Sequence, residues 1–139
     1  MKINICYIGK PRNEHANRMA EEFVRRTQRY VRCQMMEIKP AFEDPLKKYA
    51  DAFKIMLDPK GRTMNSAQFT SLLERLEREG REVVFLIGGA DGLPGNWLRS
   101  ADLLLSLSPL TFPHELARVV VTEQIYRAFT SLRGHPYPR

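Results

Sequence analysis

The sequence predicts an α/β fold in which a mainly parallel sheet is flanked by helices. Short apolar stretches alternate along the chain with longer segments whose apolar residues recur at helical spacing. Residues 83–87 form a continuous apolar run, which is typical of a strand buried on both faces. No repeat or Gly/Ser-rich linker divides the chain, so we expect one domain spanning residues 1–139.

The first third of the chain predicts a strand, a helix and a second strand. An apolar run over residues 2–9 ends in glycine and predicts the first strand. Between Ala16 and Tyr30 the apolar residues recur at helical spacing, which predicts a helix. Its other face carries arginines and glutamates, and we favour a solvated surface with ion pairs over an RNA contact. The second strand is expected over residues 32–38.

The remaining elements continue this alternation, and turn residues separate them. Asn65 or Ser66 can cap a helix that ends at Gly80, and Pro94 suits the first turn of another helix. The expected elements are a helical segment over 46–53, a very short strand over 55–57, the helix ending at Gly80, a strand over 83–87, a helix through Trp97, a strand over 103–107 and a last helix over 114–132.

Composition narrows the partners and the compartment. A net charge of +6 favours a polyanion such as nucleic acid, although charge alone is weak support. Cys6 and Cys33 lie in apolar strands without zinc-ligand spacing, so we expect buried free thiols and no metal site. No membrane-spanning run or secretory signal is visible, which predicts a cytoplasmic protein with no membrane partner.

The loops after the later strands are where a ligand is expected, because parallel sheets bind ligands at the carboxyl ends of their strands. Glycines at 88, 89 and 92 permit close approach to the backbone, either by a cofactor or by a tight turn into the next helix. Their spacing matches neither the dinucleotide fingerprint nor a phosphate-binding loop. Residues 105–114 combine small hydroxyls and apolar side chains, which suits adenine and a thioether or an ordinary connection.

These loops belong to a set of stretches that resembles the RlmH family of SPOUT methyltransferases. The matching stretches keep the order in which they occur in the family, from Leu57 almost to the end of the chain. They are residues 57–61 (LDPKG), 85–93 (FLIGGADGL), 105–114 (LSLSPLTFPH), 115–128 (ELARVVVTEQIYRA) and 134–137 (GHPY).

The resemblance implies an activity, a fold and a cofactor site. Family members transfer a methyl group from S-adenosylmethionine to N3 of a pseudouridine in 23S ribosomal RNA, as part of the large subunit or ribosome. It also implies a C-terminal trefoil knot and a homodimer, which would suit a last helix that is apolar around its circumference. The implied cofactor-binding residues are Leu57, Gly88, Gly89, Leu107, Ser108, Pro109, Leu110, Thr111 and Phe112.

By the same resemblance, the C-terminal tail supplies the catalytic residues. Arg139 is assigned to stabilising charge or holding RNA phosphate, and His135 and Tyr137 to shaping the pocket for the target base. Without the resemblance, a disordered tail would be the expectation. Tyr137 and the arginines at 118, 127, 133 and 139 could form the stacking residue and basic rim that an unstacked base requires, or be plain surface residues.

Two departures from the family pattern keep alternatives open. Residues 39–54 are fewer than the family usually has there, and Pro138 occupies a place where the family usually has a second histidine. One alternative is a ribosome-associated module that binds S-adenosylmethionine with weakened or no catalysis. The other is a nucleotide-binding domain of the flavodoxin type, which flavin or NAD would stabilise.

Overall fold

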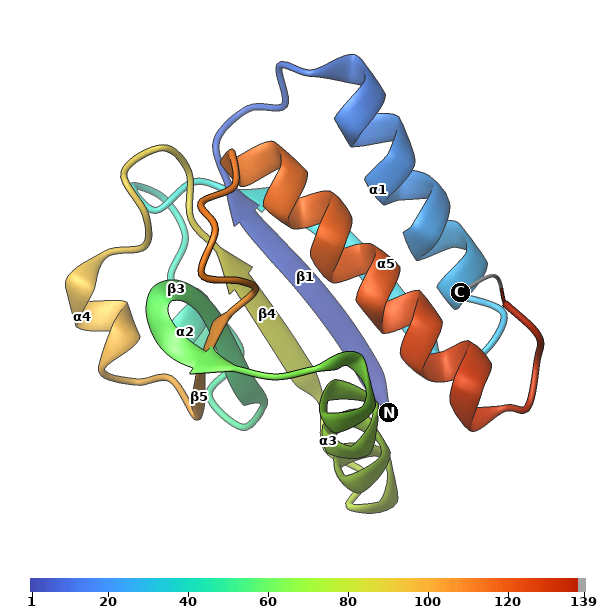
Figure 1. Ribbon diagram of the computed structural model, residues 1–139. Helices are drawn as coiled ribbons and strands as arrows, with labels where there is room; N and C mark the ends of the chain where they lie inside the picture. Colours follow the sequence, from blue (N-terminus) through green and yellow to red (C-terminus); the bar gives the residue numbers. More distant parts are fainter. Residues whose placement is uncertain (138–139) are drawn as a thin grey trace.

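The computed structural model describes residues 1–137 and confirms the predicted fold class. Five parallel strands form one sheet in the order β2-β1-β4-β3-β5, with helices on both faces (Figure 1). The elements are β1 (Lys2–Ile8), α1 (Glu14–Thr27), β2 (Arg32–Ile38), α2 (Pro45–Lys48), β3 (Phe53–Thr63), α3 (Ser66–Arg78), β4 (Val83–Ile87), α4 (Gly95–Leu98), β5 (Leu103–Ser106) and α5 (His114–Leu132).

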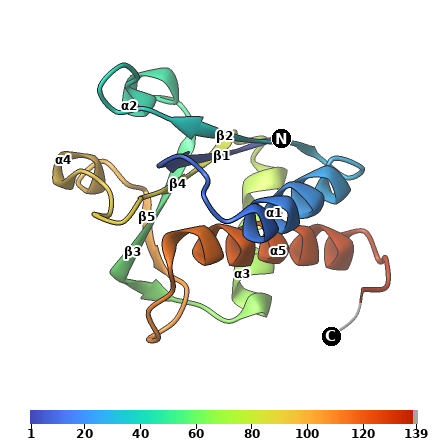
Figure 2. The same cartoon turned by 90° about the horizontal axis from the view of Figure 1, so that it is seen from above.

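Two hydrophobic clusters fill the space between the sheet and its helices. Helices α1, α3 and α5 cover one face, and the short helices α2 and α4 lie on the other (Figure 2). All five residues of β4 are buried, as predicted for a strand covered on both faces. Alternate β4 residues enter the two clusters, for example Phe85 on one face and Leu86 on the other.

Strand β3 is the largest departure from the prediction, since it spans Phe53–Thr63 rather than 55–57. Its pairing with β5 shifts register, so that Leu57 and Arg62 both pair with Leu105, and the residues between them bulge out. The sequence of this bulge contains Pro59 and Gly61, which normally indicate a turn. A Cβ on Gly61 would lie 2.6 Å from the Leu104 carbonyl carbon, so glycine permits the close strand approach.

The helices agree more closely with the sequence. Helix α3 begins with a capping box in which Asn65 and Gln68 each bind the other's backbone N–H. The charged face of α1 is a solvated surface with ion pairs, as we favoured, because Arg18 pairs with Glu14 and Arg25 with Glu22, both at 2.6 Å. Helix α2 is shorter than the predicted 46–53 segment.

The apolar circumference of α5 is explained by packing within one chain. The helix lies between α1 and α3 against the sheet, and residues such as Val121, Ile125 and Phe129 are buried there. A polar residue, Thr122, satisfies its hydroxyl by donating to backbone carbonyls of the same helix. The hydrophobicity of α5 therefore does not itself require a second subunit.

Both cysteines are buried free thiols, as predicted. Burial raises the pKa of Cys33 from 9.0 to about 12. The unfolded chain loses this thiol proton near pH 9, whereas the folded chain retains it. The Cys33 contribution to stability is therefore complete below pH 9 and is lost as the pH rises towards 12.

We expect the free energy of unfolding to fall with rising pH in this window, and Cys33→Ala to reduce the fall. One retained proton corresponds to a slope of about 1.4 kcal/mol per pH unit. Urea denaturation of both proteins at several pH values between 9 and 12 measures the difference in slope. Equal slopes for the two proteins would contradict the assignment.

Candidate active site

A cavity of about 410 Å³ lies at the carboxyl ends of β4 and β5, beside the bulge in the middle of β3. Its walls are residues 57–59 at the β3 bulge, the β4–α4 loop and the connection from β5 to α5. Three segments that are distant in sequence thus meet at one edge of the sheet. All nine residues predicted to bind a cofactor line this cavity: Leu57, Gly88, Gly89, Leu107, Ser108, Pro109, Leu110, Thr111 and Phe112.

The β4–α4 loop folds tightly on itself at the wall of the cavity. The Gly92 N–H donates to the Gly89 carbonyl at 3.0 Å, and Gly92 has a φ of +75°. A Cβ on Gly88 would lie 2.4 Å from the Gly92 carbonyl carbon and 2.7 Å from the Leu93 nitrogen. The tight turn therefore accounts for Gly88, and the same turn brings the loop backbone to the cavity.

The β5–α5 connection is held by its own hydroxyl groups. The Ser106 hydroxyl donates to the Ser108 carbonyl at 3.1 Å, and the Ser108 hydroxyl accepts from the Leu110 N–H at 2.9 Å. The Leu110 side chain, at 73% exposure, projects from this ordered loop. The connection can therefore present backbone groups to a ligand in a defined geometry.

The chemistry of the lining is mainly apolar. Among the described residues that line the cavity, Asp58 and His114 are the ionisable ones, and lysine and arginine are absent. Without a cationic side chain, the cavity suits an apolar, neutral or cationic ligand better than a polyphosphate. Residues 1–137 also contain no cluster of three or more His, Cys, Asp or Glu that could hold a metal ion.

Arg118 supports the start of α5 beside the cavity and does not form part of an exposed basic rim. Its side chain is 2% exposed, and its guanidinium lies 4.0 Å from the centre of the Tyr7 ring. It donates to Asn17 at 2.8 Å and lies 3.9 Å from Glu115. Neither alternative predicted for Arg118, an RNA contact or a plain surface residue, is correct, because this arginine is buried between α1, β1 and α5.

Glu115 ties the loop between β1 and α1 to the start of α5. Its carboxylate accepts the backbone N–H groups of Arg12 at 2.8 Å and Asn13 at 3.1 Å. These bonds lower the pKa of Glu115 and keep its carboxylate ionised, and the bond from Arg12 has the largest effect. Helical spacing is a sequence signal for the Glu115–Arg118 pair, but it does not reveal that Glu115 holds the loop or that Arg118 contacts Asn17 on α1.

The C-terminal tail folds back along α5. The Tyr137 hydroxyl donates to Glu123 at 3.0 Å, and its ring packs edge-on against Tyr126 at 4.8 Å. Burial, and then the bond to Glu123, raise the pKa of Tyr137, so its phenol is protonated at neutral pH. His135 is exposed and its backbone N–H donates to the Thr130 carbonyl, while Arg139 lies outside the described residues.

Two of the predicted rim arginines have acidic partners beside this tail. Arg127 pairs with Glu123 at 2.8 Å and lies under the Tyr137 ring at 4.9 Å. Arg133 forms a bidentate pair with Glu77 on α3. Both guanidiniums thus hold the tail and the end of α5 in place, and their charge is partly neutralised.

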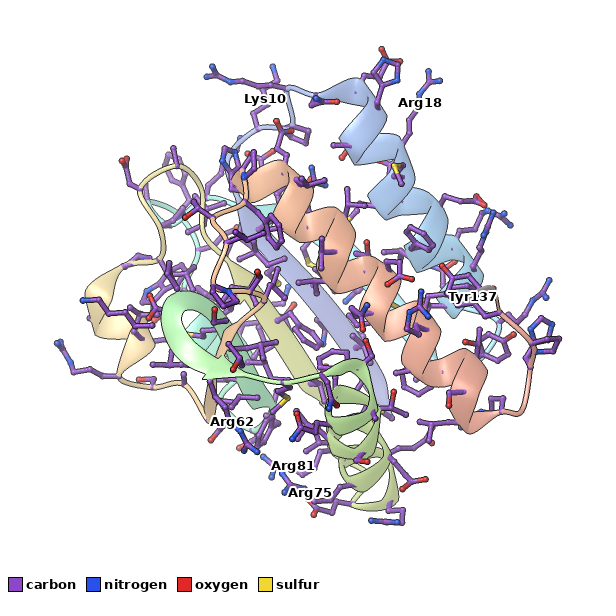
Figure 3. All side chains as sticks on the ribbon, in the orientation of Figure 1. Lys10, Arg18, Arg62, Arg75, Arg81 and Tyr137 are labelled. Carbon is purple, nitrogen blue, oxygen red and sulfur yellow. The ribbon has the colours of Figure 1, made fainter. Side chains whose placement is uncertain are left out.

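Within one chain, the tail and the cavity at β3, β4 and β5 are separate. His135 and Tyr137 line a second cavity of about 700 Å³ between α3 and the end of α5. The two cavities share no lining residue among those described. On α5, the first cavity ends at Ala117 and the second begins at Arg127, about 15 Å further along the helix. Figure 3 shows Tyr137 on the α1 side of the end of α5.

Solved structures with the same fold include proteins named as methylases or methyltransferases. A probable methylase family protein from Haemophilus influenzae aligns with a TM-score of 0.63 at 12% identity, covering 99% of this chain and 72% of that one. A tRNA (m1G37) methyltransferase from Aquifex aeolicus gives 0.62 at 14% identity, covering 100% and 75%. At these identities the comparison establishes the fold alone.

Sequence comparison then assigns the family. Residues 1–138 match the family described as "Predicted SPOUT methyltransferase". A Solibacter usitatus protein named "Ribosomal RNA large subunit methyltransferase H" is 55% identical over 100% of both chains. A protein of that name from Thermus thermophilus is 41% identical, covering 100% of this chain and 99% of its own. The chain belongs to the SPOUT methyltransferase family, and within it to the RlmH group.

We expect Gly88→Ala to destabilise the protein, because the new Cβ would meet loop backbone rather than a flexible side chain. Overpacking of this kind costs about 1–3 kcal/mol. Gly95→Ala on α4 is the matched control, since a Cβ there meets nothing within 4 Å and alanine favours a helix. Thermal unfolding of both variants checks this expectation, and equal melting temperatures would contradict it.

Proposed function

We propose that the protein transfers a methyl group from S-adenosylmethionine to N3 of a pseudouridine in 23S ribosomal RNA, with the large subunit or assembled ribosome as substrate in the cytoplasm. The observation that carries this proposal is the convergence of the nine expected cofactor residues around one cavity. The names of the full-length relatives support a ribosomal RNA substrate. No helix in residues 1–137 is long and apolar enough to cross a membrane.

The composition of the cavity fits this cofactor better than a nucleotide of the flavodoxin type. Its volume of about 410 Å³ and its apolar lining suit an adenosine with a thioether chain. Asp58 is the acidic lining residue and can attract a positively charged ligand. When bound, S-adenosylmethionine supplies an electrophilic methyl group. Two solved structures with this fold, a putative methyltransferase from Legionella pneumophila and an rRNA methyltransferase from Sinorhizobium meliloti, contain that cofactor.

The trefoil knot is part of the proposal. Strand β3 pairs with β5 both before and after its bulge, so residues 58–61 stand beside the connection that leads into α5. Gly61 lets the β3 backbone approach Leu104 closely. A chain threaded at this point would hold the three cavity loops together without a metal or disulfide.

A homodimer would bring the tail to the cofactor. Because the tail and the cavity lie at different places along α5, a second copy with a reversed α5 could place its tail at the cavity of the first. Leu110, on the cavity rim, and Leu116, on the first turns of α5, are exposed large apolar residues available for such a contact. In this arrangement His135 and Tyr137 shape the pocket for the target base, and Arg139 stabilises charge or holds phosphate.

The protonated phenol of Tyr137 limits its role in the proposed reaction. N3 of pseudouridine must lose its proton as it attacks, which leaves charge on the flanking carbonyl oxygens. A hydrogen-bond donor or cation there stabilises that charge. Tyr137, with its raised pKa, is protonated and does not accept the N3 proton at neutral pH, and its single O–H proton would have to leave Glu123 to serve as that donor.

We expect S-adenosylmethionine to bind and methylated nucleoside to appear when the protein is incubated with ribosomes that lack the modification. Calorimetry measures the first, and mass spectrometry of digested RNA measures the second. Thr111→Arg, which adds bulk and positive charge at an exposed cavity position, should abolish both. Binding without methylation would favour the non-catalytic module, and the absence of binding heat would contradict the proposal.

The shared site predicts complementation between two inactive variants. Thr111→Arg damages the cavity and Tyr137→Ala damages the tail, so a mixed dimer retains one site with both parts intact. After random reassortment, half of the dimers are mixed, and the mixture should recover about one quarter of wild-type activity. A site built within one chain would give no recovery on mixing, and sedimentation or light scattering separately reports the oligomeric state.

A further inference from the structure

Two further loops lie at the same sheet edge as the cofactor cavity and take no part in its lining. Strand order places β1 beside β4 and β2 beyond β1, so their carboxyl ends continue the edge outward from the cavity. At about 4.8 Å per strand, the β2 loop begins about 10 Å from β4. The β4–α4 loop also lies close to the end of β1, since a Cβ on Gly89 would lie only 3.1 Å from the Ile8 carbonyl oxygen.

Phe42, in the loop after β2, is the most exposed of the large apolar side chains, at 85%. The loop that presents it is tightly hydrogen-bonded. The N–H groups of Phe42 and Glu43 both donate to the Lys39 carbonyl, at 2.9 and 3.0 Å, and the Glu43 carboxylate accepts the Lys39 N–H at 2.8 Å. An aromatic ring is thus held out into solvent by an ordered turn, where a partner can cover it.

Exposed cations lie in the loops after β1 and β2, at the same edge of the sheet as the cavity. Lys10 and Arg12 lie in the loop after β1, and Lys39 begins the loop after β2. Within residues 1–137, none of the three forms an ion pair. Figure 3 shows Lys10 projecting outward beyond the start of α5. The Glu115 bonds to the backbone of Arg12 and Asn13 hold this loop in place.

The carboxylates of Glu43 and Asp44, in the loop that carries Phe42, accept backbone N–H groups, and within residues 1–137 neither forms an ion pair. Glu43 binds the Lys39 N–H, and Asp44 accepts the Leu46 N–H at 3.1 Å. Proteins that bind single-stranded nucleic acid combine an aromatic side chain, which stacks on a base, with cations that bind the phosphates. Charge complementarity therefore favours RNA over a protein partner for this surface.

We propose that Lys10, Arg12, Lys39 and Phe42 form an RNA platform that holds the single strand flanking the target nucleotide. Phe42 stacks on an unpaired base, and the three cations bind the phosphates between that base and the cavity. The inference rests on the proposed function for the identity of the RNA, since it assigns this surface to the same substrate. It also explains why an apolar ring is held in solvent.

The RNA platform is tested by measuring the binding of an oligouridylate with a fluorescent label at its 5′ end. Fluorescence anisotropy at several salt concentrations gives the affinity and its salt dependence. Phe42→Ala should weaken binding by about tenfold, and Phe42→Trp should preserve it because stacking is retained. Met19→Ala, which removes another exposed apolar side chain, is the matched control and should bind as the wild type does. Lys10→Gln with Arg12→Gln should reduce the salt slope of binding by about 1 to 2.

The charge control is Lys2→Gln with Arg29→Gln, since these exposed cations lie near the opposite edge of the sheet. It should leave the salt slope unchanged, and calorimetry should give the same S-adenosylmethionine heat for every variant. If the wild type gives no heat of binding with S-adenosylmethionine, the proposed function is refuted, but the RNA-binding measurements can still be interpreted. Equal RNA affinities and salt slopes for all variants would refute the proposal of an RNA platform. So would a Phe42→Ala variant that changes the oligomeric mass of the protein but not its affinity for RNA.

Discussion

Parallel pairing of β3, β4 and β5 is the constraint on which the site depends. Because the three strands run in the same direction, the segments that follow them must emerge at one edge of the sheet. Burial of β4 on both faces fixes the register of its neighbours. The cavity is therefore a consequence of strand direction first, and of the particular residues in the loops second.

Much of the site could be predicted because its signals are local and the sheet supplies the rest. Glycine and proline after Ile87 and Ser106 mark loops of unusual shape, and parallel topology brings such loops together. The resemblance then named the loop residues that are expected to bind a cofactor. The contribution of Gly88 was open at the sequence level, and the structure attributes it to close packing within the loop.

Other features depend on contacts that a linear pattern does not contain. The bulge in β3 keeps Pro59 and Gly61 inside a strand, because renewed pairing at Arg62 overrides the usual tendency of these residues to end one. Arg118 is buried because Tyr7, Asn17 and Glu115 surround it, although the positions of Tyr7 and Asn17 in the sequence do not suggest it. The apolar faces of α5 indicated a partner surface, but α1, α3 and the sheet already cover much of the helix.

The separation of the tail from the cavity along α5 has a genetic consequence if active sites are shared between copies. A chain with defects in both the cavity and the tail would contribute one defective part to each active site of any dimer that it joins. Intact chains in the same cell would then be inactivated in proportion to the defective ones, so such an allele would be dominant negative rather than recessive.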